Sequence, residues 1–199
     1  MRQIVIAALL ALLSVSYGSA RAKTPDTALW KKVNGWYIYI DKTVGYQCFI
    51  ANIYEDLTVF RMGFQKPSSA TALYIAIGNK NWQSLEDGKD YPLVMQVDNE
   101  KPWNSPASAA HIGKMPFLIV NTSQIQFVSQ ILRKHGLKVF FNGENILNLS
   151  LRGSAGALQE MVNCQRAVNE YLGQRKPASK DPFSGASNTR PKKDPFATY

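Results

Sequence analysis

The sequence WYIYID at residues 36–41 alternates bulky apolar with amphipathic side chains, which is the pattern of a half-buried β-strand. Three further runs rich in aromatic and β-branched residues follow it: YQCFIANIY (46–54), TVFRMGFQ (58–65) and ALYIAIG (72–78). The segments between the last three runs are short and polar, which suits antiparallel hairpins. We therefore predict that these four strands form an antiparallel meander that follows a polar lead-in.

The second half of the chain continues the strand pattern. Strands are predicted at residues 91–97, 107–112 and 117–120, and an exposed loop at residues 98–106, where Asp, Asn and Pro cluster. Two later runs, 137–141 and 146–151, flank Asn142-Gly143. This dipeptide tolerates positive φ and is the strongest hairpin signal in the chain.

Two helices are expected to pack on the sheet. Ser123 can cap the first and Gly136 can end it. The apolar stripe of that helix would comprise Ile125, Val128, Ile131 and Leu132. The second helix is expected to begin at Gly153-Ser154, with Ser154 as its cap, and to stop at Gly173. Its apolar face would comprise Ala157, Met161, Cys164, Val168 and Tyr171.

These elements predict a mainly β domain of the α+β class. It would be an antiparallel β-sheet or sandwich with two packed helices, one of them C-terminal, spanning residues 23–173. The apolar fraction of 45% and the aromatic fraction of 11% suit a globular, strand-rich domain. A chain of 199 residues has room for one such core.

Residues 1–22 have the order of a secretory signal peptide. Arg2 is followed by an apolar run, Ile4 to Leu13, and then by small residues. The run is too short to cross a bilayer, which takes roughly 20 residues. We therefore expect cleavage after Ala20 or Ala22 and a periplasmic or secreted mature protein without a transmembrane segment.

The net charge of +9 is distributed unevenly. Residues 1–22 carry two of the positive charges and residues 174–199 carry a net +4, so the predicted domain holds only +3. The segment from Gln174 onward is basic, rich in Pro and without apolar periodicity, a composition typical of a disordered tail. An exported domain whose positive and negative charges nearly cancel does not favour a nucleic-acid partner. The basic tail is a candidate for weak contact with an anionic envelope surface.

Cys48 and Cys164 are the two cysteines of the chain, and no Cys-x-x-Cys motif occurs. Two cysteines so far apart do not suit a zinc knuckle. In an exported protein they favour one disulfide, which would tie the second predicted strand to the final helix. The alternative is two free buried thiols.

The remaining titratable residues predict no catalytic site. His111 and His135 are solitary and lack metal-ligand spacing, and the acid pairs at 55–56 and 86–87 suit solvated turns. No Gly-rich phosphate-binding loop occurs. We therefore predict no catalytic residue, no bound metal and no cofactor.

Two residues remain as candidates for ligand or partner binding. Trp103 lies in the predicted Pro-rich loop, where a large aromatic side chain is costly to leave in water. Arg61 lies on a predicted strand, on the face opposite Phe60. The alternatives are that Trp103 folds back onto the core and that Arg61 is exposed or paired within the chain. Trp36 and Trp82 are expected in the core.

Three motifs carry a resemblance to known proteins. They are GYQC (45–48) before an aromatic-rich strand, WQSLEDGKDY (82–91), and the strand 147–151 running into Arg152-Gly153-Ser154 with Ala157, Leu158 and Cys164 behind it. In these motifs the chain resembles small exported proteins of Gram-negative bacteria without an assigned function and, more distantly, the invasion-associated locus B family. The resemblance covers most of residues 36–172 and implies a fold rather than an activity. The chain differs from the locus B family in having no cysteine at residues 106–111.

These observations favour a non-catalytic periplasmic domain that binds an unknown ligand or envelope protein and acts as an envelope-associated accessory module. The alternative is a hydrolase that acts on an envelope polymer through carboxylates of the turns. An enzyme should bring two acids, or an acid and a histidine, together in one cleft. A binding module should present an aromatic patch without them.

Overall fold

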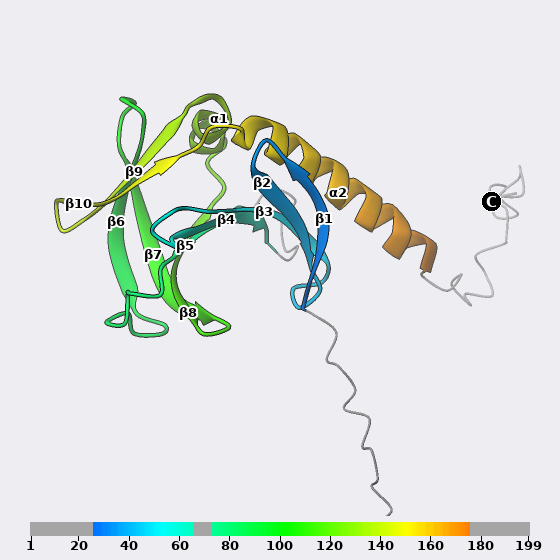
Figure 1. Ribbon diagram of the computed structural model, residues 1–199, viewed down its shortest axis with the longest axis horizontal. Coiled ribbons are helices and arrows are strands. Elements are labelled where there is room, and N and C mark those ends of the chain that lie inside the picture. Colours follow the sequence, from blue (N-terminus) through cyan, green and yellow to red (C-terminus); the bar gives the residue numbers. More distant parts are fainter. Residues whose placement is uncertain (1–25, 66–72, 176–199) are drawn as a thin grey trace, which may run out of the picture.

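The computed structural model describes residues 26–65 and 73–175, which form one antiparallel sheet and two helices (Figure 1). The elements along the chain are β1 (Thr27–Val33), β2 (Trp36–Asp41), β3 (Gln47–Ile53), β4 (Val59–Phe64), β5 (Leu73–Gly78), β6 (Asp90–Val97), β7 (Trp103–Ile112), β8 (Met115–Thr122), α1 (Ile125–Arg133), β9 (Gly136–Phe141), β10 (Glu144–Ser150) and α2 (Ser154–Arg175). The predicted signal peptide lies outside the described residues, as does the predicted tail of residues 174–199 except for its first two residues.

The strands of the sheet follow the order β1-β2-β3-β4-β5-β8-β7-β6-β9-β10, with antiparallel pairing throughout. β1 to β5 form a meander, and β8, β7 and β6 then extend the sheet in reverse chain order. The sheet twists so strongly that β6 and β4 run in clearly different directions (Figure 1). The predicted fold class is therefore confirmed, as one sheet with two helices.

The hydrophobic core lies on one face of the sheet, called here the core face. Alternate residues of each strand point into it because the side-chain period of a strand is two. Its largest fully buried side chains are Trp36, Phe60, Ile38, Ile50, Met62, Ile75, Ile77, Met95, Ile131, Leu137, Leu151 and Met161. The predicted core position of Trp36 is confirmed, and its indole N–H donates to the carbonyl oxygen of Arg152 at 2.8 Å. Trp82 is half-buried against this core.

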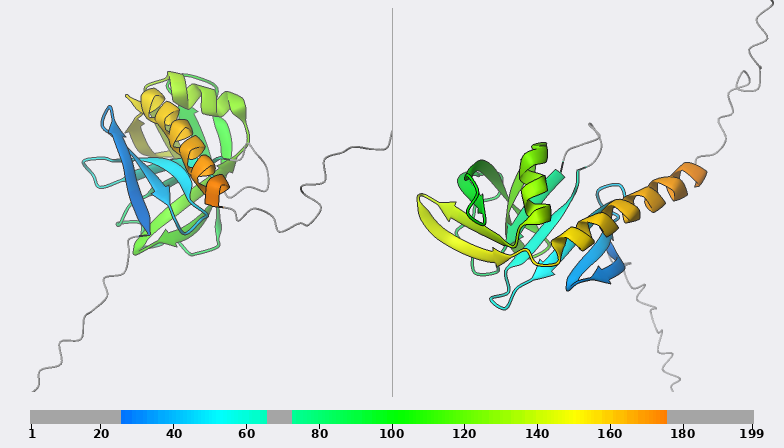
Figure 2. Two further views of the ribbon diagram at one scale, coloured as in Figure 1. Left: turned by 90° about the vertical axis from the view of Figure 1, so that its right-hand side faces the viewer. Right: turned by 90° about the horizontal axis from the view of Figure 1, so that it is seen from above.

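Both helices pack against the core face, and α2 crosses β1, β2 and β3 (Figure 2). The sequence places α1 correctly but misjudges its cap and one end of its apolar stripe. Ser123 is not its cap, since Gln124 precedes the first turn without a side-chain cap bond. Ile125 is 72% exposed, whereas Phe127 and Ile131 are buried. The other three predicted positions, Val128, Ile131 and Leu132, pack against the core, so Phe127 replaces only Ile125 in the predicted stripe.

Both ends of α2 lie close to the predicted positions, but the roles of the end residues differ. Gly153 has φ +84°, and a Cβ there would lie 2.6 Å from the carbonyl oxygen of Asn34. A glycine is therefore required where the chain turns into the helix. The hydroxyl of Ser154 donates to the carbonyl oxygen of Ile131 in α1 at 3.1 Å, so it joins the helices. Gly173 does not stop α2, which continues to Arg175.

Two strand predictions need correction. The polar lead-in contains edge strand β1, whose residues are mostly exposed and interrupted by a bulge at Trp30, so it lacks clear alternation. The predicted loop 98–106 ends early, because β7 begins at Trp103 and includes Pro106. Pro106 lies opposite Pro92 of β6, so the two missing N–H donors fall at one position of the ladder. The hairpin at Asn142-Gly143 is confirmed, with positive φ at both residues.

Candidate ligand-binding site

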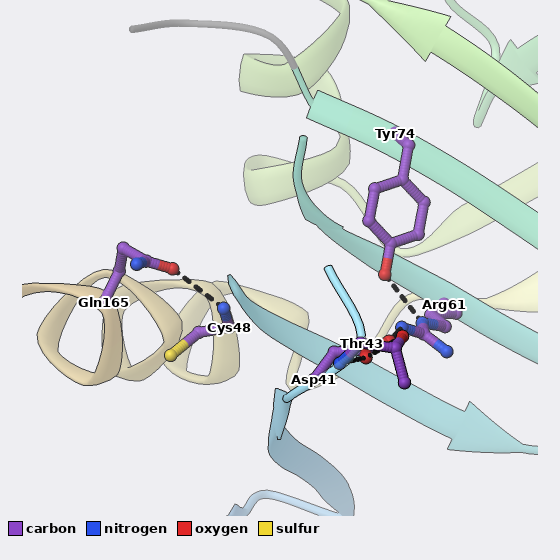
Figure 3. Close-up of polar contacts among 6 residues, drawn as sticks. All are labelled: Asp41, Thr43, Cys48, Arg61, Tyr74 and Gln165. Atoms are coloured by element: carbon purple, nitrogen blue, oxygen red, sulfur yellow. Dashed lines mark hydrogen bonds and ion pairs between the residues drawn. The ribbon is translucent and has the colours of Figure 1, made fainter. Parts of the chain in front are cut away.

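The predicted disulfide is present and holds α2 on the sheet. Cys48 of β3 and Cys164 of α2 are bonded, with their Cα atoms 6.2 Å apart and neither residue exposed. The side chain of Gln165 accepts a hydrogen bond from the backbone N–H of Cys48 at 2.8 Å (Figure 3). The helix is therefore joined to β3 by one covalent bond and one hydrogen bond at adjacent positions.

Arg61 points away from the helices, on the side of the sheet called here the outer face. It lies on β4 between Phe60 and Met62, which both face the core. Its neighbours across the ladder are Ala51 of β3 and Ala76 of β5, whose side chains are small. The long side chain of Arg61 therefore has room to lie flat along the outer face.

Gly63 provides the space into which the guanidinium folds. Phe49 and Tyr74 flank Gly63 across the ladder. The Cζ atom of Arg61 lies 3.6 Å from the centre of the Phe49 ring, and its Nε donates to the Tyr74 hydroxyl at 2.6 Å. A Cβ at position 63 would lie 2.5 Å from the Cβ of Phe49 and 3.0 Å from the ring of Tyr74. The aromatic pocket around the guanidinium therefore depends on a glycine at this position.

Asp41, the last residue of β2, neutralises the guanidinium. Its Oδ2 pairs with Nη2 of Arg61, while its Oδ1 accepts from the backbone N–H and the hydroxyl of Thr43 at 2.9 and 2.6 Å (Figure 3). The side chains of Arg61 and Asp41 are only 11% and 9% exposed. Burial acts to raise the pKa of Asp41, but the hydrogen bonds from Thr43 and Arg61 outweigh it and hold this pKa below its usual value.

Tyr74 and Arg61 each keep hydrogen-bond donors that the described residues do not use. Burial raises the pKa of the Tyr74 phenol against the opposing charge of Arg61, so the phenol is protonated at neutral pH. Its oxygen accepts from Arg61, which leaves its own hydrogen to donate. Nη1 of Arg61 has no partner among the described residues. Since no buried side-chain nitrogen or oxygen in this part of the chain lacks a partner, Nη1 is accessible.

These donors lie at an open cavity of about 650 Å³ on the outer face. Its lining comes from the start of β1, the end of β2 with the turn after it, β4 with Gln65, β5 and β8, and the end of β7 with the turn after it. The lining residues are Asp26, Thr27, Asp41, Thr43, Val44, Arg61, Phe64, Gln65, Tyr74, His111, Ile112, Gly113, Ile119 and Asn121. The volume falls within the range of small-molecule sites, and the mixture of apolar walls with a few polar groups is typical of them.

Trp103, the second candidate binding residue, lies away from this cavity. It is half-buried beneath α1, with its ring centre 5.5 Å from that of Phe127 and its indole N–H donating to Gln130 at 2.8 Å. These contacts give the ring apolar cover and satisfy its polar atom. A binding role for Trp103 stays a prediction, and its packing favours a contribution to stability.

The remaining titratable candidates are dispersed, with one exception. Asp56 accepts hydrogen bonds from Thr58 within its own turn. Nδ1 of His111 lies 2.6 Å from a carboxylate oxygen of Asp87, and both side chains are largely exposed. No group of three or more potential metal ligands occurs among the described residues. Among the described residues, the Asp87–His111 pair is therefore the one place where a predicted turn acid meets a histidine, and His111 lies at the rim of the cavity.

The sequence did not point to four residues of the site: Asp41, Tyr74, Phe49 and Gly63. Asp41 ends a strand and Tyr74 lies within one, so both look like ordinary strand residues. The signal in the sequence was the alternation of side chains along each strand, which places Arg61 on the face opposite the core-facing residues. That alternation does not reveal which side chains of neighbouring strands meet.

Comparison with known proteins supports the fold. No family model and no curated protein matches the sequence. Among solved structures, the chain is similar to the crystal structure of invasion associated protein B from Bartonella henselae, with a TM-score of 0.52 and 14% identity. The similarity covers 70% of this chain and 99% of that one. At this identity the likeness shows a shared fold, in keeping with the distant resemblance seen in the sequence motifs.

Proposed function

We propose that this protein is a non-catalytic periplasmic module that binds a small ligand in the Arg61 cavity. The observation that carries the proposal is the accessible Nη1 of Arg61, held in a fixed position by Phe49, Tyr74 and Asp41. A surface arginine that served only for solubility would not need three partners. A preorganised side chain loses little conformational freedom when it binds a ligand.

Other features of the chain support an exported binding module. The disulfide is compatible with an oxidising compartment. Within the described residues, no helix is long and apolar enough to cross a membrane. Export itself rests on the predicted signal peptide. Intact-mass analysis of protein isolated from the periplasm should find a new N-terminus at Arg21 or Lys23, and recovery of the full-length chain from the cytoplasm alone would contradict it.

NMR fragment screening tests the cavity directly. Mature ¹⁵N-labelled protein is titrated with a library of neutral, acidic and basic fragments, and the Arg61 Nε–Hε signal is followed alongside the backbone amides. We expect a subset of fragments to shift this signal together with the amides of Tyr74 and Asn121. Shifts spread over the surface, or no shift near Arg61 with any fragment, would contradict the proposal.

A pair of matched variants controls this experiment. Ile119 of β8 is half-buried, lies on the outer face and lines the cavity, so Ile119→Phe should fill it and abolish fragment binding. Val94 of β6 is also half-buried on the outer face but lines a separate cavity of about 460 Å³. Val94→Phe should leave the fragment shifts unchanged, since it adds a ring of the same size away from the cavity.

The Asp87–His111 pair favours one alternative, a hydrolase acting on an envelope polymer. A carboxylate on Nδ1 of a histidine orients the ring and leaves Nε2 to act as a base. The pair is largely exposed, and His111 has no hydroxyl or thiol partner among the described residues, which favours binding over catalysis. Release of soluble fragments from purified envelope polymer that is lost in His111→Ala, but retained in a His135→Ala control, would establish the hydrolase instead.

A further inference from the structure

We infer that the Arg61 cavity takes a neutral carbohydrate rather than a charged ligand. The inference rests on the proposed function and adds the chemical class of the ligand. It follows from three features of the site: its charge balance, the kinds of polar group around it, and the interior strands that carry its donor groups.

The charge balance of the cavity disfavours an acidic ligand. Arg61 and Asp41 form a closed ion pair, so the guanidinium offers hydrogen-bond donors without a net positive charge. Among the described residues, the charged groups of the lining are these two, Asp26, and the titratable His111, whose near neighbour Asp87 brings another acid. A carboxylate or phosphate that approached Arg61 would meet more negative than positive charge at neutral pH and would compete with Asp41.

The same balance gives little advantage to a basic ligand. Asp26 is the one lining carboxylate without an ion-pair partner among the described residues, and it is exposed. An exposed ion pair contributes little, because water and salt screen it. A neutral ligand bearing several hydroxyl groups avoids both costs, since it brings no charge that must be desolvated.

The polar groups of the cavity match hydroxyl groups, which both donate and accept. Nη1 of Arg61 and the Tyr74 O–H are available donors. Around them lie neutral side chains that can do either: Thr27, Thr43, Gln65 and Asn121. Apolar side chains of Val44, Ile112 and Ile119 supply the remaining wall. A sugar ring presents the same combination of a hydroxyl edge and apolar C–H groups.

The position of the site on the sheet argues against a peptide. Extended peptides commonly bind by adding a strand to a sheet edge, where backbone groups are unpaired. The residues that carry the donor set lie on β4 and β5, which are paired on both sides. A ligand in this cavity therefore meets side chains rather than a backbone ladder.

Sugars of matched ring stereochemistry that carry either a neutral or a charged substituent test the inference. Four neutral pyranosides (gluco, galacto, manno and N-acetylglucosamine) are compared with glucuronate and galacturonate as acids, glucosamine as an amine, and a capped dipeptide as an amide. Binding is measured at millimolar concentrations through the Arg61 Nε–Hε signal, in wild-type protein and in the Ile119→Phe and Val94→Phe variants.

We expect at least one neutral pyranoside to bind about tenfold more tightly than its charged counterpart, to lose binding in Ile119→Phe and to keep it in Val94→Phe. Tighter binding of the uronates, the amine or the dipeptide would overturn the carbohydrate inference while leaving the cavity as a binding site. If library fragments bind in the cavity but none of the four neutral sugars does, the carbohydrate inference is also overturned and the cavity remains a binding site. Absence of any fragment at the cavity would instead remove the proposed function.

Discussion

Removal of the Cys48–Cys164 disulfide is expected to cause a large loss of stability. The two cysteines are 116 positions apart, so the bond closes a loop that includes most of the described domain. In the chain-entropy model, closing a loop of this length lowers the entropy of the unfolded chain by an amount worth about 4–5 kcal/mol at 25 °C. The total stability of a domain is about 5–15 kcal/mol. The Cys48→Ala/Cys164→Ala variant should therefore lose a large share of it.

Urea unfolding followed by tryptophan fluorescence measures this loss. Wild-type protein treated with a thiol reductant should unfold close to the double variant, and the double variant itself should not respond to reductant. Hydrogen exchange adds a local readout, because α2 is joined to β3 at this bond. We expect exchange to accelerate more in α2 than in β4 and β5. A stability difference below about 1 kcal/mol, within the range of ordinary point mutations, would refute the entropic argument.

Three further predictions concern the site and Trp103. Because the pKa of Asp41 is lowered in the folded state, its contribution to stability is complete above the unfolded pKa of about 3.9 and is lost as pH falls through the folded pKa. Urea unfolding at several acidic pH values should show this slope, and Asp41→Asn should flatten it; an unchanged slope would contradict the assignment. Gly63→Ala should cost about 1–3 kcal/mol through overpacking and displace the Arg61 Nε–Hε signal, whereas an unshifted signal would show that the aromatic pocket tolerates a Cβ. Trp103→Ala should cost about 2–4 kcal/mol in thermal or urea unfolding, since the indole packs beneath α1, and a loss under about 0.5 kcal/mol would favour its binding role instead.

Much of the fold could be predicted because the relevant signals are local. The period-two runs from Trp36 to Gly78 depend on which face of a strand meets the core, and this is written in each strand separately. The hairpin at Asn142-Gly143 depends on two residues that adopt positive φ. β1 was missed because an edge strand buries little surface, and so its sequence carries weak alternation.

The candidate site could be predicted only in part. Arg61 was identified because it interrupts an apolar strand. The partners that define its chemistry, Asp41 and Tyr74, lie 20 and 13 positions away on other strands. Their meeting depends on ladder register, and a slip of one residue would move every side chain of a strand to the opposite face.

By itself the sequence determined that this chain makes a strand-rich domain with a helix at its C-terminal end, and that its two cysteines could pair with one another. The cause is that side-chain periodicity, turn residues and cysteine number act over short stretches or by simple exclusion. Only the tertiary structure decided that Arg61 is held between Phe49 and Tyr74 above Gly63 and that Trp103 packs beneath α1. Those outcomes depend on register, twist and the rotation of a short helix, which arise when distant segments share one core.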